Sequence, residues 1–210
     1  MIAQTRCRDV YQVFDRSPQV LAEILRDEVN LAVWQRQLPP QVEDFAALVV
    51  GLERPLADER VIEVDEQRTP VLSGLLPGAA DVHGYEAFVA DITWLVAAYT
   101  CLLGARRVGL RLKVLEGAMC PRFHVDHVPL RLLSTYAGAG SEWLPEGCLD
   151  RTRLHAFSAP VDKIQRLCTG DVGILKGEKF QGNEGYGIIH RSPETAVGER
   201  RLLLSLDWLA

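Results

Sequence analysis

The stretch RVGLRLKV, residues 107–114, alternates apolar side chains with mostly basic ones. Residues two apart in a strand point to the same side, so this period of two predicts a half-buried β-strand. Three more short β-type runs follow toward the carboxyl terminus, at residues 130–136, 171–175 and 200–208. Gly-rich turns at residues 137–140 and 182–185 lie between them. Such short strands favour a barrel or sandwich over a parallel α/β sheet.

The residues before this stretch are predicted to be mainly helical. Ser17-Pro18 is typical of a helix start, and apolar residues recur after it at helical spacing. Residues 30–38 and 42–52 carry further helical patterns, whereas residues 55–84 are mixed and predict a loop. In residues 85–103 the apolar side chains form one stripe at a 3.6-residue period, and Gly104 follows at the position of a capping glycine.

Together these patterns predict an α+β chain in which helices pack on one face of a small β-barrel. We expect one domain over residues 1–210, because this length suits a single core. Residues 1–105 would be mainly helical support. Residues 106–210 would form the β core and carry the functional site.

Composition excludes several classes of partner. The formal net charge is −5 and the basic residues are spread along the chain, so we expect no nucleic-acid partner. The longest uncharged apolar run, at residues 92–105, is 14 residues long, whereas a membrane-spanning helix needs about 20. The amino terminus lacks a signal-peptide pattern. We therefore expect no membrane partner and a cytoplasmic protein.

The segment CPRFHVDH, residues 120–127, carries the most chemistry. In a strand, His124 and Asp126 would present an imidazole nitrogen and a carboxylate oxygen to one point. Alone, such a pair is also typical of a surface turn with a hydrogen-bonded histidine. His190 would complete a set of two imidazoles and one carboxylate, the facial triad that holds non-haem Fe(II) with open coordination positions. By affinity alone the same set would also take Zn(II) or Ni(II).

In this order of residues the chain resembles the oxygenases that use Fe(II) and 2-oxoglutarate, and most closely their phytanoyl-hydroxylase-like branch. The resemblance covers residues 107–208 and rests on His124, Asp126, the pair Gly170-Asp171, His190 and Arg201. It implies a double-stranded β-helix, a jelly-roll or cupin-like barrel, with His124, Asp126 and His190 as the metal ligands.

The same resemblance gives Arg201 the distal carboxylate of 2-oxoglutarate, which a planar guanidinium pairs with through two charge-assisted bonds. Ser205, on the same strand face, would add a hydroxyl donor. Arg200 would point to the opposite face. The carboxylate of Asp126 favours hydroxylation over halogenation within that family.

The whole chain is also similar to an uncharacterised bacterial family with the string CPRFHVDxVPLRLL, here residues 120–133. Genes of that family tend to lie beside zinc-homeostasis genes. This keeps a second hypothesis open, a zinc-binding protein of metal homeostasis without oxygenase activity, whose ligands would be Cys120, His124, His127 and Cys148. A closed zinc site needs four such donors, usually from two closely spaced pairs, and only one pair is seen here.

Four residues around the motif have two readings each. Arg122, His127 and Arg131 could orient a ligand or contact substrate, and each could equally be a solvated charge. Trp143 could line the mouth of the site, although packing is the commoner role of such an aromatic. The substrate, a small molecule or a protein, and the oligomeric state are not specified by these patterns.

Overall fold

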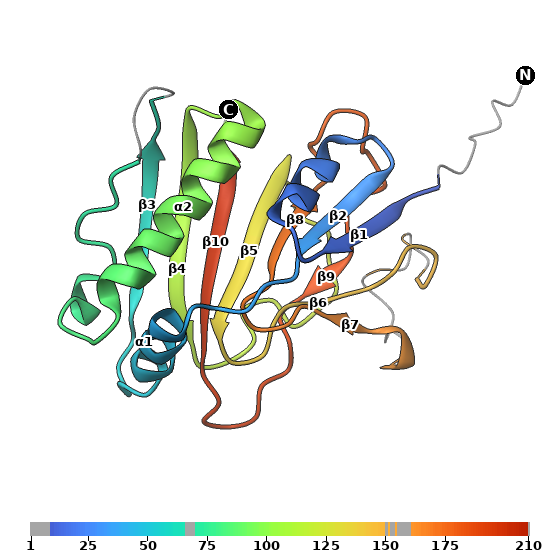
Figure 1. Cartoon of the computed structure of the whole chain (residues 1–210). Helices are drawn as coiled ribbons and strands as arrows, with labels where there is room; N and C mark the ends of the chain where they lie inside the picture. Colours follow the sequence, from blue (N-terminus) through green and yellow to red (C-terminus); the bar gives the residue numbers. More distant parts are fainter. Residues whose placement is uncertain (1–8, 66–69, 150, 152–153, 155–160, 210) are drawn as a thin grey trace, which may run out of the picture.

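The computed structural model describes residues 9–65, 70–149, 151, 154 and 161–209, and its largest element is a seven-stranded sheet (Figure 1). Strands lie in the order β1-β2-β8-β5-β10-β4-β3, and all neighbours are antiparallel except β1 and β2. A second sheet has the order β7-β6-β9. The bounds are β1 Tyr11–Asp15, β2 Val29–Trp34, β3 Ala57–Glu63, β4 Arg107–Leu115, β5 Leu130–Ala137, β6 Glu142–Trp143, β7 Gln165–Arg166, β8 Val172–Lys176, β9 His190–Arg191 and β10 Arg201–Leu209.

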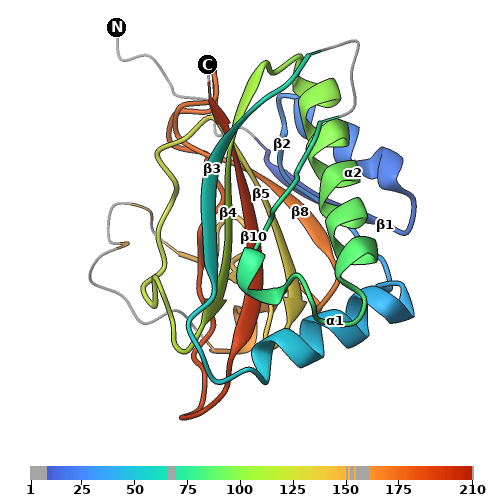
Figure 2. The ribbon, with the colours of Figure 1, turned by 90° about the vertical axis from the view of Figure 1, so that its left-hand side faces the viewer.

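Helices cover one face of the large sheet, as Figure 2 shows. They are α1 (Pro40–Val50) and α2 (Tyr85–Leu103), with shorter 3₁₀ helices at Pro18–Leu25 and Pro77–Ala79. A further 3₁₀ helix, Val161–Lys163, directly precedes β7 of the small sheet. The stripe of α2 is buried in the main core, where Phe88 packs between Phe45 of α1 and Tyr136 of β5 at ring-centroid distances of 4.5 and 4.8 Å. Burial of these aromatic side chains is the main force that holds the helices on the sheet.

Alternation along β10 divides the large sheet into two faces. Leu202, Leu204 and Leu206 point into the core beneath the helices. Leu203 points the other way, into a second cluster that also contains Trp143 of β6. Side chains at odd positions of β10 therefore face the small sheet, and the polar residues of this strand, Arg201, Ser205 and Asp207, are at odd positions.

The sequence correctly predicts α1, α2, β4, β5, β8 and β10, and the α+β class. Gly104 ends α2 with φ +59°, a left-handed conformation that glycine adopts without strain. The 3₁₀ helix after Ser17 lies where a helix is predicted to begin.

Two predictions for residues 1–105 are wrong. Residues 30–38 are not helical: Val29–Trp34 is strand β2, buried on both faces, and such a continuous apolar run cannot be told from a buried helix by its periodicity. Residues 55–84 are not all loop, since Ala57–Glu63 is β3, the edge strand beside β4. This half of the chain is thus part of the large sheet as well as its helical support.

Among the described residues, only α2 is long and apolar enough to cross a membrane by length and composition. Its apolar stripe packs in the core, with Phe88, Ile92, Leu95 and Val96 fully buried. A core helix passes the same test, so this finding is weak evidence for a membrane span.

Candidate metal centre

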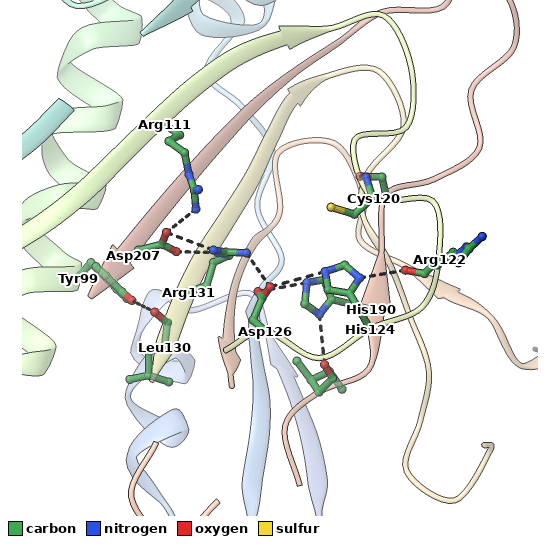
Figure 3. Close-up of polar contacts among 12 residues, drawn as sticks. Tyr99, Arg111, Cys120, Arg122, His124, Asp126, Leu130, Arg131, His190 and Asp207 are labelled. Atoms are coloured by element: carbon green, nitrogen blue, oxygen red, sulfur yellow. Dashed lines mark hydrogen bonds and ion pairs between the residues drawn. The ribbon is translucent and has the colours of Figure 1, made fainter. Parts of the chain in front are cut away.

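The two histidines are brought together by their own backbones. The amide of His124 donates to the carbonyl of His190 at 3.0 Å, and the amide of His190 returns a bond of 3.0 Å to the carbonyl of His124. His190 is the first residue of β9, which pairs with β6. In the chain, β6 follows β5 after a Gly-rich turn. The site therefore lies between the small sheet and the polar face of the large one (Figure 3).

Asp126 is positioned by the chain that follows β8. The amide of Glu178 donates to the carbonyl of Asp126 at 2.9 Å, and the amide of Gly177 donates to the carbonyl of Pro129 at 3.0 Å. These bonds fix the loop between the histidine motif and β5. As a result the carboxylate of Asp126 lies beside both imidazoles.

One ligand atom from each of His124, Asp126 and His190 lies within 4.8 Å of the other two. The Nε2 atom of His124 is 3.6 Å from Oδ1 of Asp126, and the Nε2 atom of His190 is 3.3 Å from Oδ2. The imidazole centroids are 4.6 Å apart. Asp126 and His190 are buried and His124 is about one-third exposed, so the cluster opens to solvent on one side.

The other nitrogen of each ring determines what this cluster can hold. Nδ1 of His124 is 2.9 Å from the carbonyl of Arg122, and Nδ1 of His190 is 3.2 Å from the carbonyl of Ile188. A carbonyl only accepts, so each Nδ1 donates a proton to it and each Nε2 faces Asp126. Two imidazole nitrogens and a carboxylate oxygen that converge in this way can hold a cation between them. The donor set fits a divalent metal ion.

The pKa values of Asp126 and His124 are shifted by their contacts with each other. Burial alone would raise the pKa of Asp126, but its bonds with the two histidines and the charge of Arg131 offset that effect, so this pKa lies well below its usual range. The bond with Asp126 raises the pKa of His124 more than burial lowers it. Both pKa shifts favour an ionised Asp126 carboxylate beside a protonated His124 imidazole.

Arg131 anchors the carboxylate from the far side. Its Nη1 is 2.8 Å from Oδ1 of Asp126, and its Nε is 2.6 Å from Oδ1 of Asp207. Asp207 also contacts Arg111. Because Arg131 and Asp207 are directly paired across β5 and β10, the sheet register holds Asp126 in place (Figure 3).

Arg201 of β10 is a buried cation. It is fully buried, and its Nη2 contacts the hydroxyls of Thr135 at 3.2 Å and Ser141 at 3.3 Å. Its Nε and Nη1 have no hydrogen-bond partner among the described residues. Burial, together with the charge of Arg166, lowers the pKa of Arg201 to about 10, so the guanidinium stays charged at neutral pH. A buried cation without a carboxylate is costly unless an anion completes it.

A cavity of about 230 Å³ connects these two regions. His124 and His190 line it, and so do Ser141, which contacts Arg201, and Ser205, whose buried hydroxyl has no partner among the described residues. The cavity thus extends from the histidines to the polar surroundings of Arg201.

The remaining predicted residues are distributed as follows. Arg122 is exposed and contributes its carbonyl to the site, and His127 is exposed. Trp143 is buried and stacks on Phe14 with centroids 5.6 Å apart, so packing is its role. Arg200 faces away from the site and contacts Val50 and Glu116.

The zinc hypothesis gains no support from this geometry. Cys120 lines the cavity with an exposed thiol, and Cys148 packs partly buried against a small apolar cluster. Within the part of the chain that the structure describes, the group of potential ligands is His124, Asp126 and His190, and neither cysteine belongs to it. The fourth protein donor of a closed zinc site is not found there.

Sequence reasoning missed Asp207, Ser141, Arg111 and Lys113. The signal for Asp207 was present, because it lies two residues beyond Ser205 and six beyond Arg201 on the same face of one strand. Arg111 and Lys113 were visible as the basic half of the alternation in β4. What the sequence lacks is the register that sets β4 and β5 on either side of β10.

Gly177 offers a test of how closely the loop of Asp126 must be held. A Cβ at this position would lie 2.1 Å from the carbonyl oxygen of Val128 and 2.6 Å from that of Asp126. Gly177→Ala should therefore push this loop away from β8, cost about 1–3 kcal/mol of stability and weaken metal binding. Gly117→Ala is the control, since its Cβ would meet nothing within 4 Å. Denaturant unfolding and metal titration measure both, and equal metal affinity in the two variants would contradict the expectation.

Comparison with family models gives the classification. A model described as a protein of unknown function, DUF1826, matches residues 15–207. The chain belongs to the DUF1826 family. No curated protein sequence matches this DUF1826 chain. The family string predicted from residues 120–133 lies inside the matched region.

The solved structures with a fold similar to this DUF1826 chain include three proteins described as oxygenases or hydroxylases. A protein of Shewanella oneidensis described as a candidate oxygenase superposes with a TM-score of 0.50 at 12% identity, over 95% of this chain and 90% of that one. The rice dioxygenase for auxin oxidation superposes with a TM-score of 0.49 at 13% sequence identity, over 95% of this chain and 83% of the rice protein. A prolyl-4-hydroxylase of Pseudomonas putida superposes with a TM-score of 0.45 at 12% sequence identity, over 90% of this chain and 96% of the hydroxylase. At such identities the likeness to the Shewanella protein speaks for a shared fold, and activity must be argued from the site.

Proposed function

We propose that this DUF1826 protein is a non-haem Fe(II)- and 2-oxoglutarate-dependent oxygenase that hydroxylates its substrate. The observation that carries the proposal is the pairing of two incomplete sites along one cavity. At one end two imidazole nitrogens and a carboxylate converge on one point, and at the other the buried guanidinium of Arg201 has two nitrogens without a hydrogen-bond partner among the described residues. A metal ion and a dicarboxylate together would complete both.

The metal in this proposal is held by His124, Asp126 and His190. Two nitrogen donors and one carboxylate suit Fe(II) and leave positions open for other ligands. When bound, iron and 2-oxoglutarate supply the oxidative chemistry. The protein's own share is orientation: the carbonyls of Arg122 and Ile188 fix the two tautomers, and Arg131 holds the carboxylate.

Arg201 and Ser205 are proposed to bind 2-oxoglutarate. A carboxylate placed beside Ser141 would give Arg201 the charge-assisted partner that its two free nitrogens lack. The unpartnered hydroxyl of Ser205 is a further donor that faces the cavity. Leu133 and Leu203 also line the cavity and give it two apolar side chains among its polar ones.

In this proposal the large and small sheets are the two walls of a double-stranded β-helix. The polar side chains of β5 and β10 face the small sheet, as the inner side chains of such a barrel would. Support comes from the superposition on the Shewanella protein at a TM-score of 0.50.

The experiment that tests the function is an anaerobic titration of the metal-free protein with Fe(II) and then with 2-oxoglutarate. We expect a weak visible charge-transfer band when the keto acid chelates the iron. A missing band together with tight Zn(II) binding would overturn the proposal in favour of a zinc-handling protein.

Cys120 separates the oxygenase from the zinc-binding alternative. Its thiol lines the cavity but lies outside the ligand group, so Cys120→Ala should leave the bound metal per chain unchanged. Metal analysis after dialysis measures this directly. Loss of the metal in this variant would count against the triad and in favour of thiolate ligation. Cys101→Ala, at an exposed thiol on α2, is the matched control.

A further inference from the structure

Every permanently charged side chain in the described lining of the cavity beside the candidate metal centre is a cation. Four of its lining side chains are permanent cations, Arg111, Lys113, Arg131 and Arg191, and its described lining contains no Asp or Glu. The whole chain has a formal net charge of −5, so this concentration of cations is local. Clefts lined by one sign of charge attract ligands of the opposite sign.

Two of these cations are already neutralised by buried carboxylates. Arg131 bonds Asp126 and Asp207. Arg191 bonds Glu142 at 2.7 Å, and its guanidinium lies 4.5 Å from the ring centroid of Phe123. Both side chains are therefore held by the protein itself and have structural tasks.

Arg111 and Lys113 are held much less firmly. Arg111 contacts Asp207 through one nitrogen, and Arg131 already makes two bonds to that carboxylate. Lys113 contacts Glu59, which is half exposed, and an ion pair with so much solvent contributes little. Guanidinium and ammonium groups offer five and three donors, so both residues keep donors for a ligand.

The register places these two cations at the cavity wall. Arg111 pairs with Ser205 and Lys113 with Leu203 across β4 and β10, so both side chains share the face of β10 that lines the cavity. Under the proposed function the two carboxylates of 2-oxoglutarate go to the metal and to Arg201. The cations of β4 then have no ligand from the cofactor.

We propose that Arg111 and Lys113 bind an anionic group, a carboxylate or a phosphate, of the substrate. The substrate is then an organic acid or a phosphate ester whose anionic group enters this cavity. This inference rests on the proposed function and adds the chemical class of its substrate. Arg111 and Lys113 are its specificity residues.

The test uses the full chain loaded with Mn(II), as a paramagnetic stand-in for iron, and saturated with 2-oxoglutarate. The probes are inorganic phosphate, followed by ³¹P relaxation, and ¹³C-labelled acetate, followed by ¹³C relaxation. We expect saturable relaxation enhancement for at least one anion. The double variant R111Q/K113Q should weaken that binding at least tenfold. Arg107→Gln is the control, because Arg107 lies on the same face of β4 but outside the cavity lining.

Enhancement by phosphate alone would assign a phosphate ester, and enhancement by acetate alone a carboxylic acid. Equal binding in R111Q/K113Q and wild type would overturn the inference. So would the absence of enhancement in wild type, or enhancement that disappears when 2-oxoglutarate is added, since the anion would then occupy the cofactor's place. Should the double variant not fold, Lys113→Gln alone must weaken binding several-fold, and unchanged binding there overturns the inference too.

The Fe(II) and 2-oxoglutarate band, measured in the same variants, separates the two proposals. A band that persists in R111Q/K113Q while anion binding is lost supports both. A band that is missing in wild type refutes the oxygenase itself, whatever the anions do. A band without any anion effect refutes only the substrate class.

Discussion

Asp126→Asn should abolish metal binding at the histidine cluster. The substitution keeps the shape of the side chain but removes the negative charge toward which both Nε2 atoms point, at 3.6 and 3.3 Å. Since the pKa of Asp126 lies well below its usual range, the wild-type carboxylate is ionised throughout the neutral range. Loss of an outer partner of a metal ligand costs about 10–100-fold in affinity. Loss of this ligand itself should cost more.

The measurement is a competition titration of Fe(II) or Mn(II) against a chelator of known affinity. Glu194→Gln is a fitting control, because Glu194 is an exposed carboxylate that contacts Arg191 near the same cavity. Its metal affinity should equal that of wild type. If Asp126→Asn binds metal as tightly as the control does, the triad is not the metal site.

Stability measurements on the same pair give an independent check. Without metal, wild-type Asp126 is bonded to Arg131, and Arg131 keeps its bonds to Asp207 when that partner is lost. The amide variant should therefore still fold. Excess metal should raise the unfolding temperature of wild type and of Glu194→Gln but not of Asp126→Asn, because only a folded state that binds the ion gains stability.

The sequence indicates part of the cluster of His124, Asp126 and His190 more directly than it indicates the fold, because part of this cluster is local in the chain. His124 and Asp126 are two residues apart, so their convergence is a local property of extended chain. His190 is predicted to join them only because it follows them in the order of the family's motif. The backbone of His190 pairs directly with that of His124, and this contact joins residues that are far apart in the sequence. The spacing of apolar residues along the chain cannot predict that pairing.

The errors in the first half have a different cause. β2 is buried beneath the helices on one face and against Leu133 and Leu175 on the other, so its sequence lacks the alternation of a half-buried strand. In β3 one of the buried side chains is the charged Asp58. Its burial is tolerated because its carboxylate accepts a hydrogen bond from the amide of Leu76 and pairs with Arg60. A buried ion pair of this kind removes the apolar signal from which strands are predicted.

Arg201→Gln should remove 2-oxoglutarate binding while metal binding is retained. Truncating one partner of a buried, charged hydrogen-bonded pair costs about 2–5 kcal/mol, which is a factor of roughly 30 or more in the dissociation constant. Arg200→Gln is the adjacent control, since that side chain contacts Val50 and Glu116 away from the cavity. Titration of the Fe(II)-loaded protein with 2-oxoglutarate measures both. Unaltered affinity in Arg201→Gln would refute the role of Arg201.

The same position should show opposite effects on binding and stability. Arg201 is fully buried, and two of its nitrogens have no partner among the described residues. Each unsatisfied buried polar group costs about 1–3 kcal/mol, so Arg201→Met should raise the free energy of unfolding of the ligand-free protein by an amount of that order. Saturating 2-oxoglutarate should stabilise wild type and leave Arg201→Met unchanged. A variant that is both less stable and still able to bind would mean that Arg201 is a structural residue whose partners lie elsewhere, whereas a stabilised variant without affinity would show that the chain retains this buried charge for its ligand.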